Sequence, residues 1–273
     1  MIRGNKMSPI REVYINEPGG TQKTKWSSYS ELAWVESIVA PPEEYAEDTE
    51  LFCRIIKEHS KIEPKTLLHL GCGAGRNDYI FKRHFKVTGV DTSKDMLKIA
   101  KNLNPEVVYH KNDMRTLKMD EYFDAVAIPD SIEYMVTEKD LKRAIFSANK
   151  QLKPGGVLLI VAYIKEEFVE NNFLNTGSIK DIEITVFENN YIPDSSGNTY
   201  EATIIYLIRK KGELKIYCDS HILGLFKLEV WLDILRGFEL EVKQIKLEHL
   251  YDRFILGEGK YPLIIFACTK PLK

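Results

Sequence analysis

Residues 67–78, with the sequence LLHLGCGAGRND, decide the fold of this 273-residue chain. An apolar run ends there at Gly71, Gly73 and Gly75. Glycine at the end of a strand lets the backbone adopt positive φ and lets a ligand approach without an intervening Cβ. A helix that starts after the loop offers unpaired N–H groups to polar or anionic ligand atoms. An ordinary tight turn also uses glycine, so the loop alone leaves both interpretations open.

The spacing of the glycines and of the next acidic residue helps to decide whether the loop binds a ligand and of which kind. A dinucleotide-binding loop has the pattern G-x-G-x-x-G, whereas here the third glycine comes one position early and Arg76 takes its place. Dehydrogenase activity is therefore disfavoured. Asp91 ends the next expected strand, where a carboxylate can accept hydrogen bonds from both hydroxyls of a ribose. Because Ser93 and Asp95 follow, Asp91 could instead cap a helix. Together with the glycines, the ribose role is favoured.

Short apolar strands alternate with helices on both sides of this loop. We expect helices over residues 26–40, 43–58, 93–101 and 138–151, and strands over 66–70, 87–90, 107–110, 123–128 and 157–163. Residues 152–156, LKPGG, are expected to form a turn. The first 25 residues are polar and are expected to form a loose lead-in. Such alternation predicts a parallel sheet covered by helices on both faces.

The alternation ends after residue 163. Strands are expected over residues 182–188, 202–209 and 214–219, and Lys211 and Gly212 leave a gap short enough for a hairpin. This pattern predicts an inserted antiparallel sheet. A helix over 227–235 and strands over 239–247 and 262–269 follow. The predicted fold class is therefore α/β, with a doubly wound, mostly parallel sheet and an antiparallel β insertion after strand five.

Charge and composition exclude several classes of protein. Lys and Arg number 38 against 40 Asp and Glu, so a net charge of −2 gives no general affinity for a nucleic-acid backbone. No apolar run reaches the roughly 18–20 residues of a membrane span. Neither a C-x-x-C pair nor a metal-binding spacing of His and carboxylates is present, so we predict no metal. Scattered single cysteines and no apolar leader favour a cytoplasmic protein.

Two further segments place polar groups at the ends of expected strands. Asp113 and Met114 follow the third strand, where a carboxylate can accept from the exocyclic amine of adenine; a simple turn residue is the alternative. Asp130 ends the fourth strand, in the region where open α/β sheets bind ligands.

Taken together, these segments resemble the class I S-adenosylmethionine-dependent methyltransferases. The glycine loop is similar to the family's first motif, Asp91 to its ribose acid, and Asp113 with Met114 to its adenine-binding turn. The sequences FDAV at 123–126 and LKPGG at 152–156 are similar to its later motifs. The resemblance implies S-adenosylmethionine as cofactor, S-adenosylhomocysteine as product and a seven-stranded sheet. It implies cofactor contacts from Tyr29, Gly71, Cys72, Gly73, Gly75, Asp91, Thr92, Met96, Asp113, Met114 and Asp130.

The resemblance also implies a division of the chain. Residues 1–44 are expected to form an N-terminal arm and helical lid, and residues 45–165 the cofactor-binding core. Residues 166–225 form the inserted sheet, and residues 226–273 return to the core.

A narrower resemblance is to the amino-sugar N-methyltransferases and related small-molecule N-methyltransferases. It rests on the helical lead-in with Tyr29, the inserted sheet, and CDSHILGLF at residues 218–226. In that group an N-terminal tyrosine reaches the methionine part of the cofactor, and the insert covers the acceptor and often joins subunits, so a homodimer through the insert is one expectation. Where some members carry a histidine after the fourth strand, this chain has Tyr134.

Methyl transfer from a sulfonium requires in-line alignment of acceptor, methyl and sulfur. An ammonium acceptor must also lose a proton to a base. The candidates are Asp130, Glu133, Tyr134 and His221, and we predict Tyr134 and His221 as catalytic. An ordinary imidazole titrates near neutral pH, although a single histidine is often only a structural hydrogen-bonding group. Tyr134 could instead present its ring to a cation.

The predicted function is methyl transfer to a small-molecule acceptor, first at an amine nitrogen and second at oxygen. One alternative is a methyltransferase that acts on RNA or protein. The charge balance and the lack of an Asn-Pro-Pro-Tyr-like tetrapeptide after the fourth strand disfavour it. Another alternative is a non-catalytic cofactor-binding subunit. Trp26, Trp34 and His69 are interpreted as packing residues, and Cys72 as a buried thiol.

Overall fold

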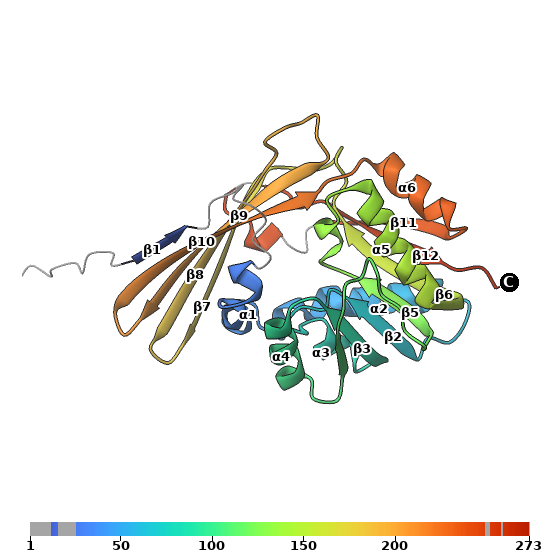
Figure 1. Cartoon of the computed structure of the whole chain (residues 1–273), viewed down its shortest axis with the longest axis horizontal. Helices are drawn as coiled ribbons and strands as arrows, with labels where there is room; N and C mark the ends of the chain where they lie inside the picture. Colours follow the sequence, from blue (N-terminus) through green and yellow to red (C-terminus); the bar gives the residue numbers. More distant parts are fainter. Residues whose placement is uncertain (1–11, 16–25, 249–251, 258, 273) are drawn as a thin grey trace, which may run out of the picture.

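The computed structural model describes residues 12–15, 26–248, 252–257 and 259–272. The chain forms two sheets, which lie at opposite ends of Figure 1. Of the predicted lead-in, only β1 (Glu12–Ile15) is described; residues 1–11 and 16–25 lie outside the described part.

The larger sheet has seven strands and is mostly parallel. Its order is β11 (Glu241–Leu247), β12 (Leu263–Thr269), β6 (Leu152–Ala162), β5 (Phe123–Ile128), β2 (Thr66–Leu70), β3 (Lys86–Asp91) and β4 (Val108–Lys111). Strand β12 runs antiparallel to both of its neighbours, and the other neighbouring pairs of this sheet are parallel. The chain leaves β2 towards β3 and β4 and then returns to β5 and β6, so the order reverses between β2 and β5. Ligands of open α/β sheets bind at such a reversal, beyond the carboxyl ends of the strands. The predicted doubly wound fold is confirmed.

Helices cover both faces of this sheet. One face packs against α5 (Glu138–Gln151) and α6 (Leu228–Gly237), and the other against α2 (Ala46–His59) and the short α3 (Asp78–Phe81). The burial of β5 explains why polar and apolar residues do not alternate along this strand. Val126 and Ile128 belong to the first core and Ala125 and Ala127 to the second, so every residue of the strand is buried.

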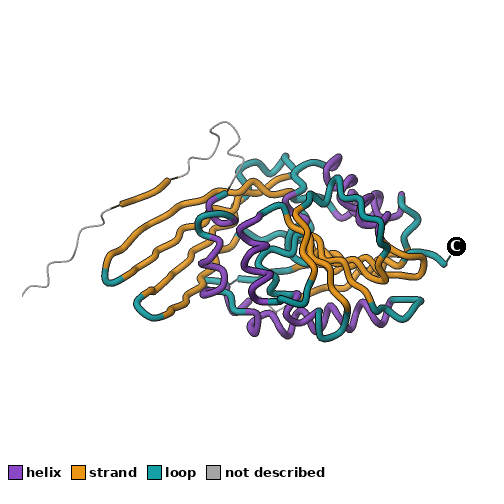
Figure 2. Tube along the Cα trace, turned by 60° about the horizontal axis from the view of Figure 1, so that its bottom comes forward, coloured by secondary structure: helices purple, strands orange, loops and turns teal. Residues whose placement is uncertain are grey.

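The second sheet is an antiparallel array that projects from the larger one (Figure 2). Its strands are β7 (Asn171–Ile179), β8 (Ile182–Tyr191), β9 (Thr199–Lys210) and β10 (Glu213–Gly224), and β1 adds to β10 in parallel. These strands are longer than predicted, and β1 and β7 were not predicted. The predicted hairpin is confirmed at Lys211 and Gly212, which take φ of 49° and 83°. Positive φ at both central residues matches the twist of a two-residue hairpin.

The inner face of the second sheet is set by strand register. Glu188, Ile204 and Asp219 lie in one cross-strand row, and His221 lies opposite Ala202 in the next row on the same face. Further along this face, buried side chains of β8 and β9 pack against α1 (Ala33–Val39). Helix α1 also contacts α4 (Lys94–Leu103), which follows β3. The inner face therefore looks towards the glycine loop side of the larger sheet.

Three predicted elements differ in the structure. The expected helix over residues 43–58 begins with the 3-10 turn η2 (Pro42–Tyr45), and α2 follows it. The expected helix over residues 26–40 is split into the 3-10 turn η1 (Ser27–Tyr29) and α1, and Ser30 between them has non-helical φ and ψ of −134° and −99°. The backbone N–H and Oγ of Ser28 both donate to Asp219, and this long-range contact competes with the helix.

The LKPGG segment is not a free turn but the beginning of β6. Its backbone is paired on several sides, since Gly155 donates to the Lys270 carbonyl and Lys270 donates to the Gly156 carbonyl. Leu152 lies opposite Phe123 of β5, with a register shift before the regular ladder begins.

Candidate functional site

The glycine loop has the backbone geometry that the sequence predicts. Gly71, Gly73 and Gly75 take φ of 69°, 52° and 77°. A Cβ at Gly71 would lie 1.9 Å from Ser131 Oγ, whereas no atom of the described residues beyond its two chain neighbours lies within 4 Å of a Cβ built at Gly73. Gly71 is therefore required by packing. The free side of Gly73 leaves the backbone open to a bound molecule, which fits the close approach of a cofactor.

Asp91 lies beside this open side of the loop. Its Oδ2 accepts from Gly73 N at 2.9 Å and its Oδ1 accepts from Ser93 N at 2.7 Å. Burial raises the pKa of Asp91, against the effect of these hydrogen bonds. The cap of α4 is Ser93, whose Oγ accepts from Met96 N at 3.1 Å. The alternative in which Asp91 caps the helix is therefore wrong, and the carboxylate faces the loop instead.

The predicted adenine-binding turn is ordered by an ion pair. Asp113 accepts from Arg115 N at 2.8 Å, from Nε at 3.0 Å and from Nη2 at 2.6 Å. Burial acts to raise the pKa of Asp113, but the Arg115 hydrogen bonds and charge outweigh it, and the net pKa is lowered. Asp113 is thus an ionised acceptor that Arg115 already shares. Met114 next to it is buried against the position of Gly71.

The other residues that are predicted to contact the cofactor differ in how deeply they are buried. Cys72 is buried, and burial raises the pKa of its thiol well above the ordinary value, which disfavours the nucleophilic thiolate. Met96 is buried against Ala74 of the loop. Thr92 is exposed. Asp130 is exposed at the end of β5 and accepts from Asn77 Nδ2 at 3.2 Å.

Tyr29 reaches the loop from the N-terminal segment. Its carbonyl accepts from Ser93 Oγ at 2.5 Å, two residues from Asp91. Its ring packs on the cluster of Ala33, Ala74 and Met96. The split of the expected helix allows this placement, because η1 turns back towards the loop before α1 begins.

The two predicted catalytic residues are in contact. The Tyr134 hydroxyl lies 2.8 Å from His221 Nδ1, although 87 residues separate them in the chain. The Tyr29 hydroxyl makes a short hydrogen bond with the Tyr134 hydroxyl. On the other side of the ring, His221 Nε2 lies 3.3 Å from Asp219 Oδ2. We call Tyr29, Tyr134, His221 and Asp219 the relay. The relay runs from the glycine loop to the second sheet.

The donors and acceptors of the relay follow from the chemistry of its ends. An ionised carboxylate only accepts, so His221 Nε2 carries the proton and Nδ1 accepts from the Tyr134 hydroxyl. Tyr134 in turn accepts from Tyr29. Burial raises the pKa of both tyrosines, which keeps them neutral. Burial acts to raise the pKa of Asp219, but hydrogen bonds from His221 and Ser28 outweigh it and lower the pKa.

Sequence reasoning missed three residues around the relay. Trp26, interpreted as packing, does pack, but on the relay itself: its ring lies 4.9 Å from that of His221 and 5.2 Å from that of Tyr134. Asp219 and Ser28 were not singled out. The spacing of Asp219 and His221 was the available signal, because residues two apart in a strand share one face.

Two partly buried carboxyl groups lie around the same aromatic groups. Burial raises the pKa of Glu133 to about 8, and the nearby charge of Asp130 adds to this shift. Burial also raises the pKa of Glu188, which accepts from Asn190 Nδ2 at 3.0 Å. The aromatic rings beside these carboxyl groups form surroundings that favour a positively charged group.

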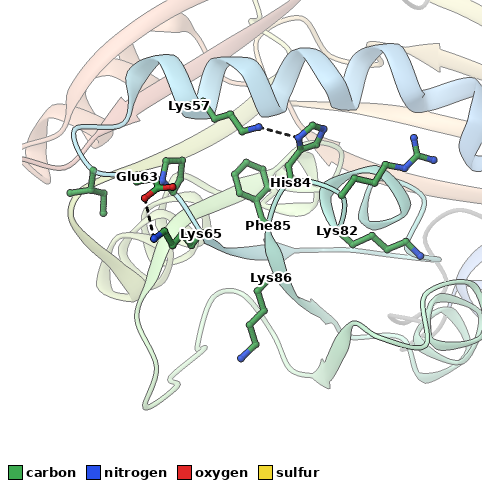
Figure 3. A pocket seen from close by; sticks show the side chains of 10 residues that line it. Lys57, Glu63, Lys65, Lys82, His84, Phe85 and Lys86 are labelled. Atoms are coloured by element: carbon green, nitrogen blue, oxygen red, sulfur yellow. Dashed lines mark hydrogen bonds and ion pairs between the residues drawn. The ribbon is translucent and has the colours of Figure 1, made fainter.

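Two other features lie away from this site. His69 is bonded to Asp78 at 2.6 Å and is buried, as expected of a core residue. A surface pocket of about 690 Å³ lies at the amino ends of β2 and β3, opposite the glycine loop. Figure 3 shows Lys57 next to His84 and Lys65 next to Glu63 in this pocket, with no residue of the relay.

Within the described ranges, His, Cys, Asp and Glu side chains do not gather in groups of three that could hold a metal ion. No helix in the described part of the chain is both long and apolar enough to cross a membrane.

Comparisons with known proteins agree with the geometry. Residues 68–160 match the family model described as a methyltransferase domain. The chain is 26% identical over 167 residues to dTDP-3-amino-3,4,6-trideoxy-α-D-glucopyranose N,N-dimethyltransferase of Streptomyces venezuelae, covering 60% of this chain and 70% of that protein. It is 28% identical to dTDP-4-amino-2,3,4,6-tetradeoxy-D-glucose N,N-dimethyltransferase of Saccharopolyspora spinosa, covering 60% and 66%.

The fold extends this similarity along most of the chain. The sugar N-methyltransferase KedS8 from Streptoalloteichus sp. superposes with a TM-score of 0.74 at 20% identity, covering 94% of this chain and 98% of that one. The glycine loop, with its open side at Gly73 and Asp91 beside it, fits an S-adenosylmethionine site. The chain is therefore a class I S-adenosylmethionine-dependent methyltransferase with a resemblance to the amino-sugar N-methyltransferases.

Proposed function

We propose that this enzyme transfers a methyl group to an amine nitrogen of a small-molecule acceptor, and that Tyr134 and His221 receive the proton that the amine loses. The observation that carries the proposal is the hydrogen bond between Tyr134 and His221 within a buried relay that begins at Tyr29 beside the cofactor loop. Relatives named as N,N-dimethyltransferases of amino sugars support an amine acceptor.

The cofactor would lie against the open side of Gly73, with Asp91 accepting from its ribose hydroxyls and Tyr29 near its methionine part. When bound, it supplies a methyl group on a sulfonium, which is already a good leaving group. The chain's remaining task is to align the acceptor and to remove its proton. Met96, Met114 and the backbone at Cys72 would line this proposed position, since Met96 and Met114 are buried beside the loop.

Proton removal follows from the directions of the hydrogen bonds in the relay. The Tyr134 oxygen accepts a proton from the ammonium as its own hydroxyl proton passes to His221 Nδ1. Tyr134 thereby stays neutral, which suits a tyrosine whose pKa burial raises. His221 ends as an imidazolium next to the ionised Asp219. The freed nitrogen lone pair can then attack the methyl group.

The test is turnover with a panel of amino sugars and other small primary amines, monitored by S-adenosylhomocysteine release and product mass. We expect Tyr134→Phe and His221→Gln each to lower kcat by about 10²-fold, the usual contribution of a positioned base. His84→Gln, in the pocket at the opposite edge of the sheet, is the matched control and should keep full activity. Unchanged kcat in both relay variants would contradict the assigned base.

The same assay separates the alternatives. Cofactor binding without S-adenosylhomocysteine release from any acceptor would favour a non-catalytic subunit. Methylation of RNA or protein in place of the amines would overturn the small-molecule assignment, which the net charge of −2 supports. A cytoplasmic location is part of the proposal and is supported by four free cysteines.

We further propose that the enzyme forms a homodimer through the outer face of the second sheet. Leu174, Phe187, Ile205 and Cys218 form one cross-strand row on the face away from α1. Ile205 is 38% exposed. A continuous apolar row of this kind is self-complementary and suits a twofold interface. Light scattering during gel filtration should give a dimer for the wild type and a monomer for Ile205→Lys; a monomeric wild type would refute the proposal.

A further inference from the structure

We infer that Asp219 is a positioning residue for the catalytic base, and that Ser28 holds it in place from the N-terminal segment. Asp219 fixes which nitrogen of His221 carries the proton and stabilises the imidazolium that forms during methyl transfer. This inference rests on the proposed function. It adds a residue to which neither the sequence nor the comparisons assign a role.

The geometry around Asp219 is that of a buried anchor. Asp219, His221 and Ser28 are 2%, 1% and 7% exposed. One oxygen of Asp219, Oδ2, receives all three donors: Ser28 N at 2.9 Å, Ser28 Oγ at 2.8 Å and His221 Nε2 at 3.3 Å. Because an ionised carboxylate has no proton to give, Nε2 must donate and Nδ1 is left to accept from Tyr134.

Ser28 and Tyr29 close the relay into a ring. Ser28 binds Asp219 at one end, and the neighbouring Tyr29 binds Tyr134 at the other. Tyr206 adds a hydrogen bond to Ser28 Oγ at 2.8 Å, so Ser28 is itself oriented to donate towards Asp219. The base is therefore assembled only when η1 is seated between the glycine loop and β10.

The surroundings of His221 make Asp219 its direct electrostatic partner. Tyr29 and Tyr134 face it from η1 and η3 (Ile132–Tyr134), and these neutral hydroxyls carry no charge. Glu188 of β8 also interacts with the imidazole charge. Glu36 of α1 interacts electrostatically with Glu188, and Tyr206 of β9 interacts with Asp219 and Glu188.

The experiment replaces the charge of Asp219 while keeping its shape. Asp219→Asn can still place an oxygen towards Ser28 and His221, but it lacks the negative charge that stabilises an imidazolium. We expect kcat to fall by about 10²-fold, with the dissociation constant for S-adenosylmethionine within about twofold of wild type. We expect the pH of half-maximal kcat to move down by about one unit. Asp181→Asn, at an exposed carboxylate in the turn between β7 and β8 of the same sheet, is the matched control.

Ser28→Ala removes one donor to Asp219 and keeps the backbone N–H. We expect a fall in kcat of about fivefold, the scale of one hydrogen bond. Asp219→Glu should recover part of the activity lost in Asp219→Asn, because it restores the charge. A pH profile and kcat of Asp219→Asn equal to those of wild type would overturn the inference.

A second measurement is made on the wild-type protein and does not depend on turnover. Nitrogen NMR of the wild-type protein with labelled histidine reports which nitrogen of His221 carries the proton, and His221→Gln identifies its signal. A proton on Nε2 supports the inference, and a proton on Nδ1 alone overturns it. If no amine acceptor is turned over, the proposed function fails while this measurement still decides the role of Asp219.

Discussion

Two single substitutions in the glycine loop separate its role in folding from its role in binding. Gly71→Ala and Gly73→Ala both place alanine at positive φ, 69° and 52°, which costs about 1 kcal/mol. Only at Gly71 does the new methyl group also collide with a neighbour, Ser131 Oγ at 1.9 Å. Because that hydroxyl donates to the Leu70 carbonyl at 3.1 Å, moving it also costs a hydrogen bond.

The magnitudes differ enough to measure. For Gly73→Ala we expect a loss of about 1 kcal/mol of stability, or roughly 2–4 °C in Tm. For Gly71→Ala, overpacking and the displaced hydroxyl raise the loss to about 3 kcal/mol, or roughly 6–12 °C. For cofactor binding the order of the two variants is reversed, and Gly73→Ala has the larger effect. The Gly73 methyl group would enter the open side of the loop and weaken S-adenosylmethionine binding by about 1–3 kcal/mol, or roughly 5- to 150-fold.

Differential scanning calorimetry gives the two Tm values, and isothermal titration calorimetry gives the affinity of each variant for S-adenosylmethionine. If Gly73→Ala binds the cofactor as tightly as wild type, the cofactor does not lie against this loop and the reasoning fails. If Gly71→Ala is as stable as Gly73→Ala, the contact between the loop and Ser131 is wrong.

Further substitutions test single groups of the site. Asp91→Ala should weaken cofactor binding by about 1.5–3 kcal/mol, the scale of hydrogen bonds to a charged group, as measured by titration calorimetry; equal affinity would remove the ribose role. Burial raises the pKa of Glu133 from 4.5 to about 8, so the neutral acid is the form that the fold favours. The wild type should therefore lose up to about 5 kcal/mol of unfolding free energy relative to Glu133→Gln as pH rises from 4.5 to 8, and parallel urea-unfolding curves across this range would contradict it. Arg115→Ala should raise the pKa of Asp113, because the arginine hydrogen bonds and charge are what lower this pKa in the wild type. NMR of the carboxyl carbon measures the pKa in both proteins. The same pKa in both would show that the ion pair is not made in solution.

The sequence alone predicted those features of the structure that depend on residues close together in the chain. The strand before the glycine loop, the positive φ of the three glycines and the hairpin at Lys211 are local features with a local signature. Strand β5 was also predictable, because burial on both faces leaves a continuous apolar run. The order of such motifs along the chain then limited the fold to one family.

Prediction failed where distant segments compete with local preference. Residues 26–40 have a helical pattern, but the hydrogen bonds that Ser28 donates to Asp219 interrupt the helix. Tyr29 is thereby turned towards the glycine loop. Strand β7 was missed because its sequence, NNFLNTGSI, is polar and has no clear strand pattern. It forms because β8 supplies its backbone partners over nine paired positions, from Asn171 to Ile179.

The amino-acid sequence by itself determined the cofactor half of this enzyme: the glycine loop, Asp91 and the sheet that presents them, all encoded by short-range patterns. Only the tertiary structure decided the proposed acceptor half. Residues 28, 134, 219 and 221 meet because η1, η3 and the register of β9 with β10 bring them to one place. Side chains alternate between the two faces of a strand, so a slip of one residue would turn Asp219 and His221 away from Tyr134. No local pattern records that register.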